Sequence, residues 1–339
     1  MQRTRYLLRV ERPTIDLNPI MRKKIDSQYK GFPLRSHGKS IEEFISEKPN
    51  LFTSDFQFPI MVLRESALAH NIGRMAAYCK GLGVDLAPHV KTPMSPQIAK
   101  RQLDAGAWAI TVASYSQASV FLDFGFNRII IGNEVLEPTS IQDIAKRNFI
   151  GKAEILFYVD SIAALNIVKA AIKDQTDAKI NLLIEIGASD GRAGLRDISL
   201  LPTILEAIKS EPKISVRGVS GFEGAVPGGD RDAGVAHIRS FLEKIVAAAA
   251  VVAPYVNGKV IISAGGSSYF DYVAQEFSKY KGDAHIILRS GGYVSHDHVH
   301  YEEAFVAPLT APGRRRFARV AVPGIDVAGA DRRGQNRCC

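Results

Sequence analysis

The sequence predicts an α/β fold in which a (β/α)8 barrel of the TIM type takes up most of the chain. Eight short β-rich segments alternate with helical stretches between residues 84 and 293, which matches such a barrel in number and length. Polar and glycine-rich residues follow these segments, where a barrel carries its functional loops. An open doubly wound sheet has the same local alternation, often with fewer strands, and is the alternative.

The elements are expected in the following order. Residues 1–57 form an N-terminal extension that is charged and poorly periodic over most of its length. The barrel region covers residues 58–308, and it opens with a strand at Phe58–Leu63 and a one-sided apolar helix at Glu65–Gly83. The expected barrel strands are Val84–Val90, Trp108–Ala113, Arg128–Ile131, Ile155–Asp160, Ile180–Ile186, Ser215–Phe222, Val260–Ser263 and His285–Leu288. The expected helices between them are Pro96–Asp104, Gln117–Phe124, Thr139–Arg147, Ile162–Lys173, Leu200–Lys209, Asp232–Val252 and Tyr269–Phe277.

The character of the chain changes after Pro312. Residues 313–339 hold seven arginines against two aspartates, contain no lysine and end in two adjacent cysteines. This composition is typical of a disordered tail. A sharper interpretation is that a reading-frame shift replaced an original second domain, so residues 309–339 are expected to be a remnant or frame-shifted tail.

Composition limits the classes of function. The tail supplies +5 of the net charge of +8, so the body is only mildly basic and gives no reason to expect nucleic-acid binding. The longest apolar run, Ile245–Ala253, is too short to span a bilayer, so no membrane partner is expected. Three cysteines make no disulfide framework, and the cytoplasm is the expected compartment.

Lys91 is the first candidate for chemistry. It lies in the motif Pro88-His89-Val90-Lys91-Thr92, with which the first barrel strand ends, and no other strand has a lysine or arginine at this position. A lysine at a strand end is commonly a solvated residue. Inside a barrel mouth it loses part of its hydration, which lowers its pKa and makes it a competent amine for a Schiff base.

Two glycine-rich turns follow the seventh and eighth strands. The first is Gly265-Gly266-Ser267, and the second is Ser290-Gly291-Gly292-Tyr293. Glycine lets backbone N–H groups approach an anion, serine adds a hydroxyl donor, and barrels often bind phosphate with these two loops. A single Gly-Gly pair is more often a tight turn, but two pairs in the two expected loops favour a phosphate site.

Arg192 lies in the loop after the fifth strand, beside the expected pocket. It has two interpretations of equal weight, a partner for a phenolate oxygen or substrate carboxylate, and a structural pair with Asp190. The run from His296 to His300 places histidines at alternate positions, as metal ligands in a strand would be. Such runs are often polar loops and no third partner is evident, so no metal ligand is assigned.

Taken in order, these motifs resemble a known family. The residues that carry the resemblance are Leu86–Thr92, Arg101–Trp108, Thr111–Ala113, Tyr158–Ser161, Gly191-Arg192, Gly221–Gly224, Ser263–Ser267, Leu288–Gly291, Tyr293 and His296-Asp297. They resemble the D-threonine aldolase and D-serine dehydratase-like enzymes, which use pyridoxal 5′-phosphate and have a barrel like that of alanine racemase (fold type III). The match runs from about Phe58 to Pro308 and is closest to the bacterial amino-acid deaminase branch.

The resemblance implies roles for individual residues. Lys91 is the lysine that holds the cofactor as an imine, with His89 and Arg192 beside the cofactor. The turns at Gly265, Gly266 and Ser267 and at Ser290, Gly291 and Tyr293 hold its phosphate. A tyrosine often stands at the position of Phe222, so no proton-transfer role is given to Phe222. The family continues into a β-rich domain that supplies ligands for a divalent metal, and no such sequence is legible after Pro312.

The implied function is a pyridoxal-phosphate-dependent lyase that acts on small D-hydroxy amino acids, by loss of a β-hydroxyl or by cleavage of the Cα–Cβ bond. A racemase is the second enzymatic possibility. A non-catalytic pyridoxal-phosphate carrier and an inactive truncated product are the others. The resemblance also implies a homodimer.

Overall fold

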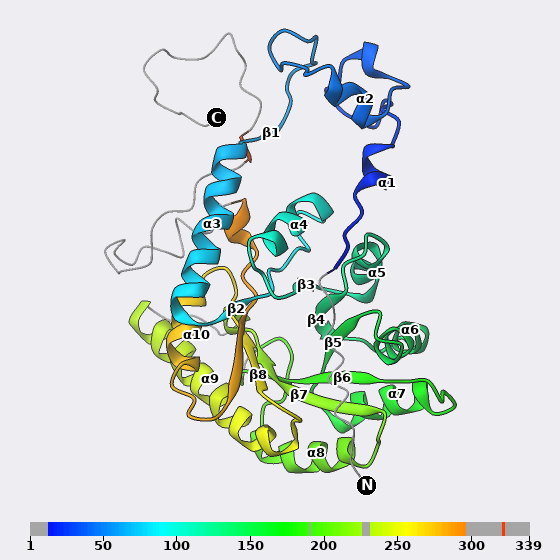
Figure 1. Ribbon diagram of the computed structural model, residues 1–339. Coiled ribbons are helices and arrows are strands. Elements are labelled where there is room, and N and C mark those ends of the chain that lie inside the picture. The colour runs from blue at the N-terminus through cyan, green and yellow to red at the C-terminus, as the bar shows by residue number, and fades with distance from the viewer. Residues whose placement is uncertain (1–12, 190, 226–230, 296–320, 323–339) are drawn as a thin grey trace.

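Eight parallel strands form a barrel in the computed structural model, which describes residues 13–189, 191–225, 231–295 and 321–322 (Figure 1). The strands hydrogen-bond in the order β3-β4-β5-β6-β7-β8-β9-β2. Their bounds are β2 Asp85–Leu86, β3 Ile110–Val112, β4 Arg128–Glu134, β5 Glu154–Val159, β6 Ile180–Ile186, β7 Ile214–Gly221, β8 Val260–Ala264 and β9 Ala284–Leu288. The predicted barrel is therefore confirmed.

The barrel is closed between its first two strands, β2 and β3. The N–H of Trp108 donates to the Leu86 carbonyl at 2.7 Å, and the N–H of Thr111 donates to the Pro88 carbonyl at 2.9 Å. In the opposite direction, the N–H of Val90 donates to the Thr111 carbonyl at 2.8 Å. An open doubly wound sheet would leave these groups at two separate edges, so that alternative is excluded.

Helices surround the barrel. Their bounds are α3 Glu65–Leu82, α4 Pro96–Asp104, α5 Tyr115–Asp123, α6 Pro138–Phe149, α7 Ile162–Ile172, α8 Leu201–Lys209, α9 Arg231–Val252 and α10 Phe270–Phe277. Although α3 precedes β2 in sequence, its Asn71 side chain donates to the carbonyl of Val294, just beyond β9, at 3.2 Å. Helix α3 therefore occupies the place of the helix that would follow the last strand, and it completes the ring.

Local capping explains several helix bounds. Ser95 caps α4, its hydroxyl accepting the N–H of Ile98 at 3.3 Å, with Pro96 in the first turn. Ser114 and Ser161 cap α5 and α7 in the same way. Gly83 ends α3 in the left-handed conformation, φ 66°, which glycine adopts without strain.

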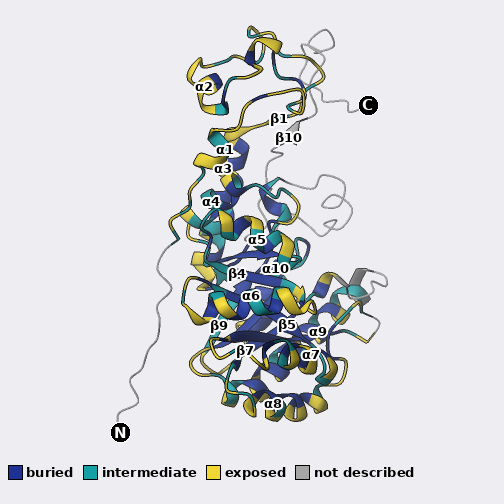
Figure 2. Ribbon diagram, turned by 90° about the vertical axis from the view of Figure 1, so that its right-hand side faces the viewer, coloured by how far each residue is buried: buried dark blue, intermediate teal, exposed yellow. Residues whose placement is uncertain are grey.

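The core has two layers, one inside the barrel and one between the barrel and its helices (Figure 2). Strand residues alternate between them, because successive side chains point to opposite faces of a strand. The inner layer is apolar at the middle of the barrel and consists of Ala87, Ala109, Ile130, Leu156, Tyr158, Leu183, Ile261 and Ile287. Each side chain of this kind stabilises the fold by about 1.5–3 kcal/mol when fully buried, except for the small alanines.

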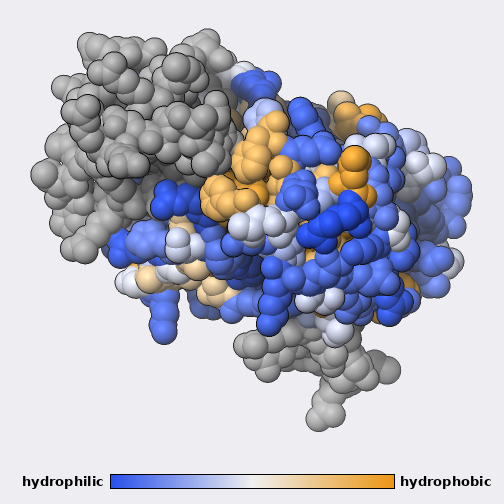
Figure 3. Space-filling view, turned by 90° about the horizontal axis from the view of Figure 1, so that it is seen from above, coloured by the Kyte–Doolittle hydropathy of each residue, from blue (hydrophilic) through white to orange (hydrophobic). Residues whose placement is uncertain are grey.

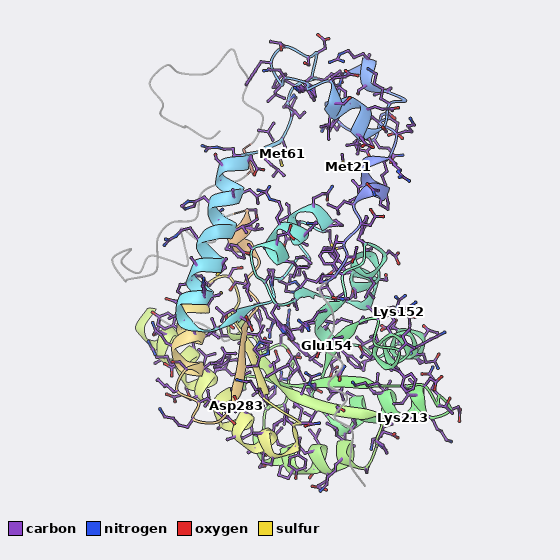
Figure 4. All side chains as sticks on the ribbon, in the orientation of Figure 1. Met21, Met61, Lys152, Glu154, Lys213 and Asp283 are labelled. Carbon is purple, nitrogen blue, oxygen red and sulfur yellow. The ribbon has the colours of Figure 1, made fainter. Side chains whose placement is uncertain are left out.

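A charged layer lies below this apolar layer, at the end of the barrel where the strands begin. Glu154, labelled in Figure 4, accepts hydrogen bonds from Arg128 Nε and Arg217 Nη1, each at 2.8 Å. The guanidinium of Arg128 lies 4.7 Å from the centre of the Trp108 ring, and the Trp108 and His285 rings meet edge to face. These contacts close that end of the barrel with paired charges.

The segment before the barrel contains two short helices, α1 Asn18–Met21 and α2 Ile41–Ser46, and a cluster of aromatic rings. Its beginning is tied to the barrel helices because the N–H of Asp16 donates to the Phe124 carbonyl at 3.0 Å. Large apolar side chains are exposed in it, Phe52 and Met61 among them, and Figure 3 shows apolar surface gathered within a mostly hydrophilic face.

The strand expected at Phe58–Leu63 is present but shorter. It is β1, Val62–Leu63, which pairs antiparallel with β10, Ala321–Val322, outside the barrel. Residues 309–339, which are expected to be disordered, lie outside the described residues apart from β10. The predicted domain bounds stay predictions. Within the described ranges, no helix has both the length and the apolar character needed to cross a bilayer.

Candidate active site

The ends of the barrel strands bring polar side chains together above the apolar inner layer. Several lie two residues after an inner apolar residue, as the period of a strand dictates: His89, Thr111, Tyr158, Glu185, Ser263 and Arg289. Ser220 joins them from β7 and donates to the Tyr158 hydroxyl at 2.8 Å. The floor of the mouth is therefore polar, although it is formed by inward-facing residues of the same strands that supply the apolar inner layer.

Lys91 lies in the turn directly after this layer. Its amine makes no hydrogen bond or ion pair with any described residue. Much of the residue is exposed, yet partial burial lowers the pKa of the amine, and the positive charges of Arg192 and Arg289 lower the pKa further. The predicted nucleophile is therefore unpartnered and biased toward its neutral form.

His89 stands two residues before Lys91. Burial, followed by the charges of Lys91 and Arg289, lowers the pKa of the imidazole to about 3. The ring is therefore neutral at physiological pH. Its Nδ1 is buried and has no hydrogen-bond partner in the described part of the protein. Buried nitrogens without a partner are uncommon in folded proteins, so this one is a candidate contact for a ligand.

Arg289 is a buried cation that sequence reasoning gave no role. Its guanidinium donates to the Gly221 carbonyl at 2.8 Å and to the Ser263 hydroxyl at 3.2 Å, and also to the Ser220 hydroxyl. It lies 5.7 Å from the centre of the Tyr158 ring. No carboxylate of the described residues forms an ion pair with it, so its charge is available to an anionic or electron-rich group.

Three carboxyl groups, Glu134, Asp160 and Glu185, lie at the ends of β4, β5 and β6. The pKa of Glu134 is raised to about 7, first by burial and then by the hydrogen bond and charge of Asp160. Burial also raises the pKa of Glu185, against the attraction of Arg289 and Arg192. Asp160 accepts the N–H of Gly194 at 3.1 Å and so holds the loop that carries Arg192. Sequence reasoning missed Glu134 and Glu185.

Arg192 is exposed at the mouth, and its guanidinium lies 5.2 Å from the centre of the Phe222 ring. This distance is typical of a cation–π contact. Asp190, the alternative partner of Arg192, lies outside the described residues. Arg192 is thus near Lys91, as expected, and no described carboxylate forms an ion pair with it.

The two glycine-rich turns lie side by side, as predicted. The Ser290 hydroxyl lies 3.0 Å from the carbonyl oxygens of both Gly265 and Gly266. The N–H of Gly292 donates to the Ser267 hydroxyl at 3.1 Å. A Cβ on Gly291 would lie 2.1 Å from the His89 carbonyl oxygen, so the second turn also packs tightly against the Lys91 motif.

The turns differ from expectation in their donors. The N–H groups of Gly265 and Gly266 donate to the carboxylate of Glu223, the first residue of η3 (Glu223–Ala225). The N–H groups of Ser267 and Gly291 have no acceptor among the described residues. Both turns therefore contain a backbone N–H without an acceptor. In the first turn this N–H belongs to Ser267, the residue that follows the glycine pair.

Tyr293 lies on the outer side of the barrel. It is 1% exposed, and its hydroxyl accepts a hydrogen bond of 2.7 Å from Gln102 of α4. The structure therefore brings eight of the nine predicted site residues to the mouth (His89, Lys91, Arg192, Gly265, Gly266, Ser267, Ser290 and Gly291), with Tyr293 behind them. The run from His296 to His300 lies outside the described residues.

The mouth suits a small aromatic aldehyde that carries a phosphate group. An unpartnered amine, a buried nitrogen without a partner and a buried cation face it, and two turns offer open amides. An amine of lowered pKa reacts with an aldehyde, and open amides bind phosphate oxygens. The residues present therefore fit the cofactor that the sequence predicts.

Comparison with known proteins agrees with this arrangement. Residues 63–274 match the family model of the alanine racemase N-terminal domain. D-threonine aldolase of an Arthrobacter species is 30% identical over 168 residues, which are 50% of this chain and 44% of that protein. The 3-hydroxy-D-aspartate aldolase of Paracoccus denitrificans is 26% identical over 233 residues, 66% of this chain and 58% of that one.

The fold is also found in solved structures. D-threonine aldolase from Filomicrobium marinum has a TM-score of 0.64 at 22% identity, and the match covers 79% of this chain and 69% of the other. The chain spans about half the length of the curated relatives it matches. With more than half of its residues matched by the family model, the chain belongs to the family of the alanine racemase N-terminal domain.

Proposed function

We propose that the protein binds pyridoxal 5′-phosphate through Lys91 and acts as a lyase on small D-hydroxy amino acids. One observation carries the proposal. The Lys91 amine has no partner in the described residues, and it lies near Arg192 and Arg289 at the mouth of the barrel. The family consists of pyridoxal-phosphate enzymes, and the matched relatives are named for D-threonine and 3-hydroxy-D-aspartate.

When bound, the cofactor supplies an electron sink for charge that develops at the α-carbon of an amino acid. The protein's own groups do the rest. Lys91 Nζ would hold the cofactor, and its amine, whose pKa is lowered, is the candidate group to accept or return a proton at the α-carbon. Arg289 holds a fixed positive charge on the floor of the mouth, where three hydrogen bonds prevent it from turning away. Such fixed charges stabilise developing negative charge without reorganisation.

The carboxyl groups of Glu134 and Asp160 form the second part of the proposed chemistry. A group whose pKa lies near 7 both gives and takes protons efficiently at physiological pH. The pair is therefore suited to protonate a leaving β-hydroxyl, or to take the proton from it when the Cα–Cβ bond is cleaved. Which bond is cleaved distinguishes the dehydratase from the aldolase.

The cofactor test uses the purified protein. Lys91→Ala is expected to abolish the near-ultraviolet and visible absorption of the bound aldehyde, and borohydride reduction followed by peptide mapping is expected to mark Lys91. Lys179→Ala is the matched control, because Lys179 is exposed immediately before β6, at the opposite end of the barrel. A chromophore retained by Lys91→Ala, or a label on another lysine, contradicts the proposal.

The substrate test compares D-serine and D-threonine as substrates. Ammonia and a keto acid indicate a dehydratase, and glycine and an aldehyde indicate an aldolase. Inversion to the L-amino acid indicates the racemase. A protein that binds the cofactor but yields no product is a carrier.

The remaining proposals concern the setting of the enzyme. The cysteine content supports the cytoplasm, because it offers no disulfide framework. The resemblance to the D-threonine aldolase family supports a homodimer, which light scattering tests. The family's divalent metal has no assigned ligand in this sequence, and activity after chelation tests whether a metal is needed.

A further inference from the structure

The carboxylate of Glu223 occupies the first two amides of the turn after β8. Its Oε2 accepts the N–H of Gly265 at 3.0 Å, and its Oε1 accepts the N–H of Gly266. Successive backbone amides that converge on one anion form a nest, the arrangement that many phosphate sites use. In this turn the group in the nest is a carboxyl side chain of the protein itself. Burial raises its pKa, and the amides of Gly265 and Gly266 and the charge of Arg289 oppose that rise.

The carboxylate is firmly enclosed. Glu223 has no exposed surface, and Gly265 has a φ of +98°, which a residue with a side chain adopts only with strain. A Cβ on Gly266 would lie 2.8 Å from Phe222 Cε2 and 3.1 Å from Glu223 Oε1. Moving the carboxylate out of the nest would leave buried polar groups without partners, which is costly. The contact is therefore part of the fold.

Two backbone N–H groups of the glycine-rich turns remain without an acceptor. The N–H groups of Ser267 and Gly291 have no acceptor among the described residues. The Ser267 hydroxyl already accepts the N–H of Gly292 at 3.1 Å, so its own proton is directed elsewhere. Ser290 joins the carbonyl side of the first turn to the second turn. The open amide of Ser267 therefore belongs to a turn whose two preceding amides, those of Gly265 and Gly266, are bound to Glu223.

We infer that Glu223 is a positioning residue of the phosphate site, which fixes the turn so that the Ser267 and Gly291 amides receive the phosphate. Glu223 itself does not contact the phosphate and stays in place when the cofactor binds. The inference rests on the proposed function, since it concerns the phosphate of the proposed cofactor. It also explains why a buried carboxylate lies against a turn expected to bind an anion.

The test compares two ligands that differ only in the phosphate. Dissociation constants for pyridoxal 5′-phosphate and for pyridoxal are measured by absorbance titration of the full chain. In Glu223→Gln the amide nitrogen would face a backbone N–H, so one hydrogen bond to a charged group is lost. Affinity for pyridoxal 5′-phosphate is expected to fall about 10- to 100-fold. Pyridoxal affinity is expected to stay within about twofold.

Glu276→Gln is the matched control. Glu276 is 1% exposed and lies on α10, where it pairs with Arg239 and Lys279, away from the turn. It should leave both affinities unchanged. If Glu223→Gln weakens both ligands equally, the role is merely structural and the inference is overturned. If the unaltered protein binds neither ligand, the proposed function itself fails. That outcome differs from an equal loss of both affinities in Glu223→Gln, which overturns only the role of Glu223.

A measurement on the unaltered protein covers the case in which Glu223→Gln does not fold. Residue-resolved amide hydrogen exchange is recorded with and without pyridoxal 5′-phosphate. The amides of Gly265 and Gly266 are expected to exchange slowly in both states. Those of Ser267 and Gly291 should become protected only when the cofactor is present. If the cofactor instead speeds exchange at Gly265 and Gly266, it displaces the carboxylate and the inference is wrong.

Discussion

The two ends of the barrel contain the same kinds of residue and use them in opposite ways. At the end where the strands begin, Glu154 is paired with both Arg128 and Arg217. At the mouth, the cations of Lys91 and Arg289 form no ion pair with any described carboxylate. Paired charges cost little once buried, whereas unpaired ones persist only where they serve another purpose. The pairing of charges, more than their number, separates the structural end from the functional end.

The largest energetic effect expected at neutral pH comes from breaking the paired end. Burial alone would raise the pKa of Glu154, but Arg217 and Arg128 outweigh it and the net pKa is lowered. Glu154→Ala leaves two partly buried guanidinium groups without a partner, and should lower the free energy of unfolding by about 3 kcal/mol. Urea denaturation measures this loss. Asp104→Ala, which breaks the exposed pair with Lys100, should cost less than about 1 kcal/mol.

Cofactor affinity sharpens the same comparison. A folded Glu154→Ala protein should bind pyridoxal 5′-phosphate as the unaltered protein does, because the apolar inner layer separates the two ends. A large loss of affinity would show that the two ends are coupled and that the division between them is wrong.

The next effect is a pH dependence that originates at the mouth. His89 has a pKa of about 3 in the folded protein and about 6.5 when unfolded, so the unfolded chain binds the additional proton between these values. His89 therefore contributes stability above pH 6.5 that is lost as the pH falls toward 3, at up to about 1.4 kcal/mol per pH unit. His89→Gln should remove this slope in urea denaturation, and His70→Gln, at an exposed histidine of α3, should keep it.

The smallest effect has the opposite sign. Glu134 has a raised pKa of about 7, so its contribution is present below the unfolded value near 4.5 and is lost as the pH rises through 7. Glu134→Gln should therefore be more stable than the unaltered protein at pH 8, by about 1 kcal/mol after allowance for solvent screening. Thermal unfolding at pH 5 and pH 8 measures the difference. Equal effects at both pH values would contradict the assignment.

Much of the fold was predictable because its signals are local. Both β6 and α4 have the predicted bounds to the residue, since a run rich in isoleucine and leucine marks β6 and a serine–proline cap marks α4. The predicted strand at Val84–Val90 is realised as the shorter β2, with an isolated bridge at His89. Pro88 lies between them and has no N–H to donate to a neighbouring strand. Pro59 stands likewise within the part of the expected first strand that is absent.

The geometry of the candidate site was predictable where its residues lie in loops and not where they lie within strands. Lys91 and the glycine turns follow strand ends, and that position identified them. Glu185 and Arg289 lie at or just after the ends of apolar strands, and the alternation of inward-facing residues could have found them. The contact between Glu223 and Gly265 joins residues from two different loops, and no local pattern in a single sequence reports it.

The position of α3 in the ring has a consequence for how the chain can grow. Because α3 runs back toward the start of β2, its first turn lies on the side of the barrel where Lys91 is found, and the chain leaves β9 on that same side. Polypeptide added before α3 and polypeptide added after β9 therefore emerge as neighbours, as the pairing of β1 with β10 illustrates. Extensions at either terminus can cooperate in one accessory sheet at the end of the barrel where Lys91 lies, without altering a single barrel strand.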